Sequence, residues 1–371
     1  MRLGDYIEEL CEKTNINNQY EVLTSSQNGI VSQKDYFNKQ VASENNIGYK
    51  IIKKGEFTYR SMSDTGLFYI NQLINYEIGI VSPAYPVFRI SNNNLDPEFL
   101  QFYFQSSKFQ HQICNQSTGS TRLALKFRKL ASLDISIPSL IKQKKIICNL
   151  KTFKNAIKIE EKQLFLLDEL IKSRFIELFG DIVCNDKSWT TEAITKVCPI
   201  KQYDGKITEC DGKVWLLNLD LVESNTGTVL DKYYVAKNEI GNSTITFSEN
   251  NVLYSKLRPY LNKVIIPDGN GYATSELVPF YPLSQVNKYY LAYALRSDSF
   301  VTLINSKANG AKMPRAPMDF IRSFPLPLPP IELQNEFAEF VKQVDKLKFV
   351  VQKRIELYKE LLDKKMDEYF N

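Results

Sequence analysis

The chain has 371 residues, of which 43% are hydrophobic and 24% are charged, and its formal net charge is +5. This length favours two domains, and the composition is typical of a soluble globular protein. There is no run of 18 uncharged apolar residues, and the opening "MRLGDYIEEL" has no apolar core of the signal-peptide kind, so we expect a cytoplasmic protein without a membrane partner. Six scattered cysteines and a single histidine argue against a zinc site or a disulfide framework.

Residues 1–139 are predicted to form a mixed α+β unit. Alternating stretches such as "YKIIKKGEFTYR" and "YEIGIVSPAYPVFRI" predict strands, and Gly, Asn and Asp mark the turns. Asp96 followed by proline predicts a helix N-cap, after which Phe99, Leu100 and Tyr103 share one helix face.

Residues 140–180 predict a long helix, and residues 331–371 predict a second one. Each helix, with about 38 residues, would be on the order of 57 Å long. In both, apolar side chains recur in alternating steps of four and three, which is the seam of a coiled coil. The predicted seam positions are Ile146, Leu150, Phe153, Ile157, Glu160, Leu164, Leu167, Ile171, Arg174 and Leu178, then Phe337, Val341, Val344, Lys348, Val351, Ile355, Tyr358, Leu362, Lys365 and Tyr369.

Neither seam can stay exposed to water, so we expect the two helices to pack on each other in antiparallel fashion. The alternative is that each helix lies on its own domain. Residues 140–180 also carry 9 basic against 5 acidic side chains. This excess fits either a solvated helix face or a helix that lies along a phosphate backbone.

Residues 181–330 repeat the first unit. "PEFLQFYFQSSKF" from position 97 matches "KYYLAYALRSDSF" from position 288, and "ISIPSLIKQKKI" from 135 matches "LPLPPIELQNEF" from 326, both at an offset of 191. Tyr59 and Tyr254 match at an offset of 195, so the middles of the two units differ. The predicted fold class is therefore α+β, with two such units separated by two long antiparallel coiled-coil helices.

Motifs for catalysis and cofactor binding are missing. The sequence has no G-x-x-x-x-G-K-[ST] loop, no Gly-rich turn that opens a helix to receive a dinucleotide, and no aromatic-anchored Asn-Pro-Pro segment. The best catalytic alternative is a Mg-dependent DNA nuclease that uses Asp211 and Lys213, although "DGK" is also an ordinary turn sequence. A further alternative is a protein scaffold joined through its long helices.

The arrangement as a whole resembles the specificity (S) subunit of type I restriction-modification systems. The resemblance covers essentially the whole chain, and "SRFIELFGD" at 173–181 is similar to that family's central region. The motif residues lie where each unit joins its long helix through a proline. They are Ile137, Pro138, Leu140 and Gln143 in one copy and Pro327, Leu328, Pro329, Pro330, Ile331 and Gln334 in the other. Two features depart from the family: the first copy has Ser139 and Lys142 where the second has Pro330 and Leu333, and neither has the Glu that usually precedes the Gln.

The resemblance implies a non-catalytic reader of double-stranded DNA. Segments 1–139 and 181–330 would be target recognition domains for the halves of a bipartite, asymmetric site, and segments 140–180 and 331–371 would be spacers. The implied partners are two methyltransferase (M) subunits, which bind S-adenosylmethionine and methylate adenine. An ATP- and Mg-dependent restriction (R) subunit can join them. No cofactor is expected in this chain.

Cations and hydroxyls beside strand ends and glycine loops are the predicted DNA contacts, because such groups bind base edges and phosphates. The alternative for each of them is a solvated surface group. Tyr59 and Tyr254 could abut DNA, but a tyrosine with its ring in the core is the favoured interpretation. The predicted DNA-binding residues are Arg60, Ser61, Thr121, Arg122 and Lys126 in the first unit, and Lys256, Arg258, Lys263, Lys312 and Arg315 in the second.

Overall fold

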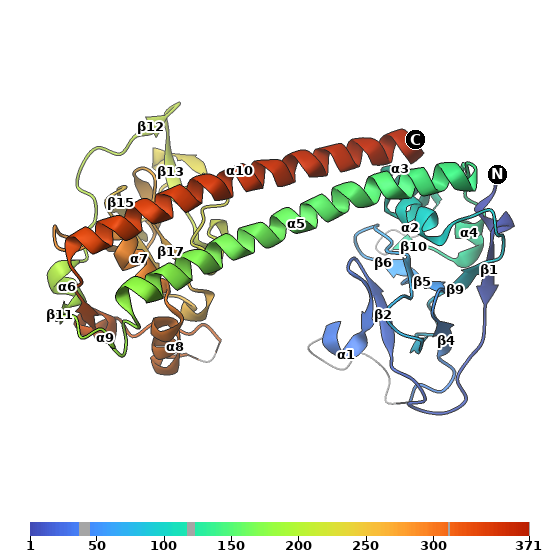
Figure 1. Cartoon of the computed structure of the whole chain (residues 1–371), viewed down its shortest axis with the longest axis horizontal. Coiled ribbons are helices and arrows are strands. Elements are labelled where there is room, and N and C mark those ends of the chain that lie inside the picture. Colours follow the sequence, from blue (N-terminus) through green and yellow to red (C-terminus); the bar gives the residue numbers. More distant parts are fainter. Residues whose placement is uncertain (37–44, 117–122, 311, 371) are drawn as a thin grey trace. The chain divides into compact units, whose positions relative to one another are not determined.

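The computed structural model describes residues 1–36, 45–116, 123–310 and 312–370, and the chain divides into two compact units (Figure 1). The first unit comprises Met1–Glu161 and Lys353–Asn371, and the second comprises Lys162–Gln352. Each long helix therefore contributes one half to each unit.

The first unit is built on an antiparallel sheet with strand order β1-β9-β5-β7, accompanied by three two-stranded sheets. The sheet strands are β1 (Ile7–Leu10), β9 (Val87–Ile90), β5 (Phe57–Thr58) and β7 (Asn71–Gln72). The other pairs are β2 (Leu23–Ser26) with β3 (Gly29–Ser32), β4 (Lys50–Lys53) with β8 (Ile78–Val81), and β6 (Met62–Ser63) with β10 (Leu123–Ala124). The stretch "YKIIKKGEFTYR" forms two strands, because Gly55 has a φ of +90° and turns the chain between β4 and β5.

Helices cover this sheet and supply much of its core. They are η1 (Leu3–Asp5), α1 (Gln33–Tyr36), α2 (Pro97–Gln105), α3 (Ser107–Gln116) and α4 (Phe127–Ala131). The predicted cap is confirmed, since the Glu98 amide donates to Asp96 Oδ1 at 2.9 Å. The predicted apolar face of α2 is also confirmed, because Phe99, Leu100 and Tyr103 are buried.

The second unit has a larger mixed sheet of order β12-β13-β18-β15, with β14 paired to β13, and a three-stranded sheet of order β17-β16-β19. The pairing of β13 with β18 is parallel, and that of β16 with β17 and β19 is antiparallel. The strands are β12 (Glu209–Cys210), β13 (Lys213–Leu217), β14 (Tyr234–Ala236), β15 (Thr244–Phe247), β16 (Val252–Ser255), β17 (Val264–Ile265), β18 (Gly271–Thr274) and β19 (Leu277–Phe280); β11 (Thr191–Ala193) pairs with β20 (Pro325–Pro327). The helices are α6 (Ile194–Val197), η2 (Leu219–Leu221), η3 (Lys237–Glu239), η4 (Pro259–Leu261), α7 (Lys288–Arg296), α8 (Asp298–Lys307) and α9 (Met318–Ser323).

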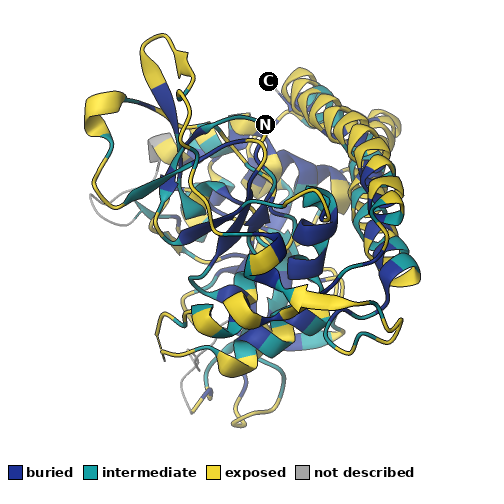
Figure 2. Cartoon of the chain, turned by 90° about the vertical axis from the view of Figure 1, so that its left-hand side faces the viewer, coloured by how far each residue is buried: buried dark blue, intermediate teal, exposed yellow. Residues whose placement is uncertain are grey.

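The long helices are α5 (Leu140–Phe179) and α10 (Ile331–Phe370), drawn in green and red in Figure 1. Every predicted seam position on them is buried or half-buried, whereas their outer sides are exposed (Figure 2). In the first unit Asn149 donates to Tyr369 Oη at 2.9 Å, and in the second Arg174 donates to Glu336 at 2.7 Å. The start of α5 thus meets the end of α10 and the end of α5 meets its start, so the predicted antiparallel pairing is confirmed.

Helix α5 stops at Gly180, which adopts a φ of +74° and donates its amide to the Ile176 carbonyl at 2.8 Å. A Cβ at this glycine would lie 1.9 Å from Asp186 Oδ1. Only glycine can therefore end the helix here without displacing the following turn.

The internal repeat is a property of the folded framework. Helices α2, α3 and α5 become α7, α8 and α10 when their bounds are shifted by 191 residues. The same shift relates backbone hydrogen bonds: the Leu3 amide donates to the Leu133 carbonyl at 2.8 Å, and the Ile194 amide donates to Phe324 at 3.0 Å.

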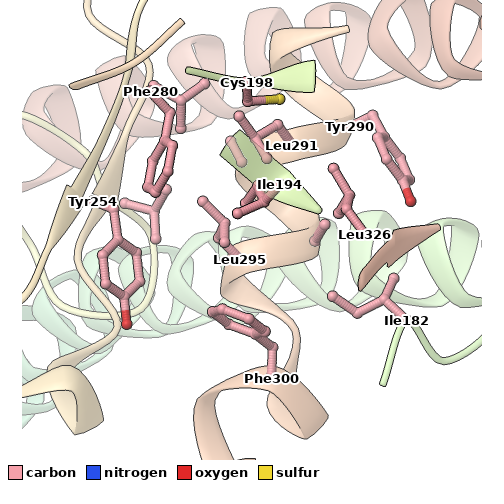
Figure 3. Packing of buried hydrophobic residues seen from close by; sticks show 14 of the residues in the cluster. Ile182, Ile194, Cys198, Tyr254, Phe280, Tyr290, Leu291, Leu295, Phe300 and Leu326 are labelled. Atoms are coloured by element: carbon pink, nitrogen blue, oxygen red, sulfur yellow. The ribbon is translucent and has the colours of Figure 1, made fainter. Parts of the chain in front are cut away.

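The core of the second unit joins sheet, helices and coiled coil (Figure 3). Ile194, Tyr254, Leu291 and Phe300 pack together there with Phe175 of α5 and other buried side chains. Because both long helices contribute apolar side chains to this cluster, the framework fixes each helix firmly to the sheet.

Candidate nucleic-acid interface

In the first unit the structure brings together the two segments that carry the predicted contacts. Strand β6 pairs with β10, and the Leu125 amide donates to the Ser61 carbonyl at 2.9 Å. Arg60 and Lys126 are exposed and Ser61 is half-buried, so these side chains flank one junction of two loops. Thr121 and Arg122 lie outside the described residues.

The second unit joins its two predicted segments in the same way. The Ala316 amide donates to the Lys256 carbonyl at 2.8 Å, and the Arg258 amide donates to the Pro314 carbonyl at 2.7 Å. A bridge also pairs Leu257 with Arg315. Lys256 and Arg258 are half-buried, and Lys312 and Arg315 are exposed.

These two junctions are equivalent in the repeat. The donors Leu125 and Ala316 are 191 positions apart, and the acceptors Ser61 and Lys256 are 195 apart. The same backbone hydrogen bond thus occurs in both units, between segments that repeat at the two offsets found in the sequence. Each unit therefore presents the same loop junction but with different side chains on it.

Arg258 sits in a strained turn. It has a φ of +50° and precedes η4, and Asn262 at the other end has a φ of +49°. Left-handed conformations of non-glycine residues cost on the order of 1–3 kcal/mol and cluster at functional sites. Among the described residues Arg258 Nε is buried and has no hydrogen-bond partner.

Lys263 has a different environment from the other predicted cations. Its ammonium donates to the Leu219 carbonyl at 2.6 Å, and burial lowers the pKa of this group. The Leu219 carbonyl accepts one of the three N–H donors of this ammonium, and the DNA contact of Lys263 stays a prediction.

The Arg315 guanidinium is paired with a carboxylate that sequence reasoning missed. Nη2 donates to Glu276 Oε1 at 2.8 Å and Nε lies 3.4 Å from Oε2. The Lys256 amide donates to the Glu276 carbonyl at 3.0 Å, which ties this acid to the same junction. No local signal points to Glu276, because it is 39 positions from Arg315 and stands beside a strand.

Tyr59 and Tyr254 have their rings in the core, as the favoured interpretation predicted. Their exposed fractions are 0% and 5%. Burial raises the pKa of both hydroxyls far above the ordinary value.

The residues of the nuclease alternative lie at a hairpin turn. Cys210 pairs with Lys213, and Asp211 and Gly212 between them have φ values of +50° and +71°. Two consecutive residues with positive φ form the tight turn that suits Asp-Gly in β-hairpins. No group of three His, Cys, Asp or Glu side chains able to hold a metal ion occurs among the described residues.

Two of the basic side chains on α5 contact their own unit. Lys151 forms an ion pair with Glu98, and Lys154 donates to Gln105 Oε1 at 2.6 Å. These contacts attach α5 to α2.

The family model described as "Type I restriction modification DNA specificity domain" matches this chain twice, over residues 6–167 and 186–358. The chain belongs to this family. The resemblance noted in the sequence and the predicted α+β repeat are thereby confirmed. The specificity family is described by DNA recognition rather than by catalysis. The two matched stretches correspond to the two repeats.

One curated relative is similar to part of this chain in sequence, and two solved structures are similar to it in fold. The type I restriction enzyme EcoDI specificity subunit of Escherichia coli is 22% identical over 134 residues, which span 36% of this chain and 30% of that protein. A solved structure titled for complex assembly and conformational transition of the type I R-M system covers 99% of this chain and 96% of its own, with a TM-score of 0.60 at 15% identity. The type I restriction-modification S subunit from M. genitalium covers 100% and 95%, with a TM-score of 0.52 at 12% identity.

Within the described part of the chain, no helix combines the length and apolar character needed to cross a bilayer.

Proposed function

We propose that this chain is the DNA-recognition subunit of a type I restriction-modification complex. It reads a bipartite, asymmetric sequence and directs adenine methylation, and restriction, by partner subunits. The observation that carries this proposal is the duplicated loop junction, where Leu125 bonds to Ser61 and Ala316 bonds to Lys256 in equivalent positions of two units.

The two units have separate tasks in this proposal. Segments 1–139 and 181–330 are target recognition domains, and each reads one half of the site. Segments 140–180 and 331–371 are spacers that fix the distance between the half-sites. Two observations support this division. The repeated helices have the same lengths and spacing in both units, whereas the strand orders of the two units differ. A constant frame can therefore carry two different DNA-reading surfaces.

The partners follow from the same duplication. A methyltransferase that recognises the frame of one unit finds an equivalent frame on the other, so two M subunits bind one chain. S-adenosylmethionine, ATP and Mg²⁺ belong to the M and R subunits, and none is assigned to this chain. The alternatives are a Mg-dependent DNA nuclease and a protein scaffold that is joined through its long helices.

Single-molecule methylation mapping of the host genome, with this gene intact and deleted, tests the proposal. One split motif should lose its N6-methyladenine on deletion and regain it when the wild-type gene is restored. A restored gene carrying Asp211→Ala and Lys213→Ala should rescue methylation fully, since those residues only form a turn. Unchanged methylation at every motif after deletion would contradict the proposal.

Salt dependence of DNA binding separates the reader from the scaffold. For a DNA-binding protein that neutralises phosphates, the logarithm of the DNA affinity falls linearly with the logarithm of the salt concentration. A scaffold without DNA contacts would not bind DNA at any salt concentration. Cleavage of DNA by the purified chain with Mg²⁺, abolished by the same two substitutions, would favour the nuclease.

A further inference from the structure

We propose that Arg315 reads a guanine in the half-site of the second unit and that Glu276 is its positioning residue. This inference rests on the proposed function and names a chemical target for part of it. It would place a G·C pair, contacted in the major groove, in the sequence that this unit recognises.

Within the described part of the chain, only one edge of the Arg315 guanidinium is paired, and Glu276 is its partner. A guanidinium has five N–H donors, and Glu276 takes one from Nη2 and one from Nε. The three remaining donors are on Nη1 and Nη2, at the outer edge. Guanine presents N7 and O6 as adjacent acceptors in the major groove, and a guanidinium edge bonds both at once.

The main chain holds both partners in place. Arg315 exchanges two backbone hydrogen bonds with Asn309, at 2.9 and 3.2 Å, and Glu276 accepts from the Lys256 amide. The Glu276 side chain is 22% exposed and the Arg315 side chain is 57% exposed. The acid is thus anchored at the junction while the guanidinium faces outward, which lowers the entropy lost when Arg315 binds.

Stability alone does not explain the pair. Exposed ion pairs contribute about 0–1 kcal/mol to folding. A carboxylate among cations also weakens attraction to phosphates, so its presence there disfavours a purely electrostatic role. The Glu276 carboxylate instead serves to orient the Arg315 guanidinium.

The pair also distinguishes the two units. Ala124 occupies the position equivalent to Arg315 at the offset of 191, so the first unit lacks this guanidinium at an otherwise shared junction. Specificity must reside in side chains that differ while the frame stays the same.

The test is selection from a random duplex library by the complex purified from its native cell, with wild type, Arg315→Ala, Arg315→Lys and Glu276→Ala. We expect the wild type to select a split motif with a guanine that both Arg315 variants lose, by roughly 5- to 150-fold in preference, with the other positions unchanged. Arg315→Lys keeps the charge and lacks the planar fork, so its loss of preference reports recognition rather than folding. Replacing that guanine by 7-deazaguanine should weaken wild-type binding and leave the Arg315 variants unaffected.

Glu276→Ala separates positioning from charge, with Glu8→Ala as the matched control. Glu8 pairs with Arg89 at 2.8 Å on strands β1 and β9, so both substitutions free one arginine and add one positive charge. Both should raise affinity for every duplex, but only Glu276→Ala should reduce the preference for guanine.

The outcomes distinguish this inference from the function on which it rests. If the wild type selects no motif, the proposed function fails and this inference fails with it. If the wild type selects a motif that is unchanged in the Arg315 and Glu276 variants, only this inference is overturned. Uniform weakening by Arg315→Ala across all sequences, with a smaller salt slope, would show a phosphate contact and would also overturn it.

Discussion

Gln143 and Gln334 are fully buried side chains, 191 positions apart, that make the same three hydrogen bonds. Each amide oxygen accepts from the N-cap amide of a short helix, and each amide nitrogen donates to two carbonyls at 2.7–3.1 Å. The partners are Asp96, Asn94 and Pro138 for Gln143, and Asn287, Gln285 and Pro329 for Gln334. Gln143 thus bonds the first turn of α5 to the loop before α2, and Gln334 bonds the first turn of α10 to the loop before α7.

Replacing either glutamine by alanine should therefore destabilise its unit by a similar amount. Each substitution removes three hydrogen bonds made by a fully buried side chain, and we expect a loss of roughly 2–4 kcal/mol in the free energy of unfolding. Urea denaturation followed by circular dichroism measures both variants. Tryptophan fluorescence isolates Gln334→Ala, because Trp189 and Trp215 lie in the second unit.

Gln352→Ala is the control for these variants, since Gln352 is an exposed residue of α10. It should change stability by less than about 0.5 kcal/mol. A loss confined to one of the two buried glutamines would contradict the equivalence of the repeats.

Lys263 and Lys312 should respond in opposite ways to substitution by methionine. Lys263→Met removes the bond to the Leu219 carbonyl and should lower stability by about 1–3 kcal/mol, with the salt slope of DNA binding unchanged. Lys312 is exposed, so Lys312→Met should leave stability intact and reduce that slope by about one. Thermal melts and binding titrations at several salt concentrations measure both properties. Equal salt slopes for Lys312→Met and wild type would remove Lys312 from the interface.

Tyr59→Phe should stabilise the first unit slightly without changing DNA affinity. The Tyr59 hydroxyl is buried without a hydrogen-bond partner among the described residues, so its removal relieves a desolvation penalty of about 1 kcal/mol. Tyr103→Phe is the matched control, because the Tyr103 hydroxyl donates to Gln112 Oε1 at 2.7 Å and its loss should destabilise the unit. Weaker DNA binding by Tyr59→Phe at unchanged stability would instead indicate a contact with the duplex.

Cys198 should resist alkylation while the other thiols react. It is fully buried, and burial raises the pKa of its thiol to about 12, whereas Cys11, Cys114, Cys148, Cys184 and Cys210 are exposed. At pH 8 its thiolate fraction is on the order of a thousandfold lower than that of an ordinary thiol. Mass spectrometry after treatment with iodoacetamide measures each site, and rapid labelling of Cys198 in the folded chain would refute its buried placement.

The raised pKa of the Cys198 thiol also predicts a pH dependence of the free energy of unfolding. The thiol stabilises the fold fully below its ordinary pKa of about 8.5, and this contribution is lost as pH rises from there through about 12, because the unfolded chain releases the proton first. The difference in unfolding free energy between wild type and Cys198→Ala should therefore shrink as pH rises above about 9. A difference that is constant between pH 7 and pH 11 would contradict the prediction.

The repeated framework of this protein could be predicted from local patterns in the sequence. Helical periodicity is local, so the seams from Ile146 and from Phe337 could be predicted, and the structure has every seam position buried or half-buried. The cap at Asp96 and the repeat at an offset of 191 were likewise visible, because capping chemistry and internal similarity need no knowledge of distant contacts.

Which polar groups meet at the loop junctions depends on the tertiary fold and could not be predicted. Lys263 looked like a free cation until the Leu219 carbonyl, 44 positions away, was found beside its ammonium. Glu276 had no distinguishing signal in the sequence, yet it forms an ion pair with Arg315. Glu276 directly precedes β19, which pairs with β16, and the loop after β16 pairs with Arg315 through Leu257. A side chain's partner depends on loop closure over many residues, and periodicity in the sequence carries no information about that geometry.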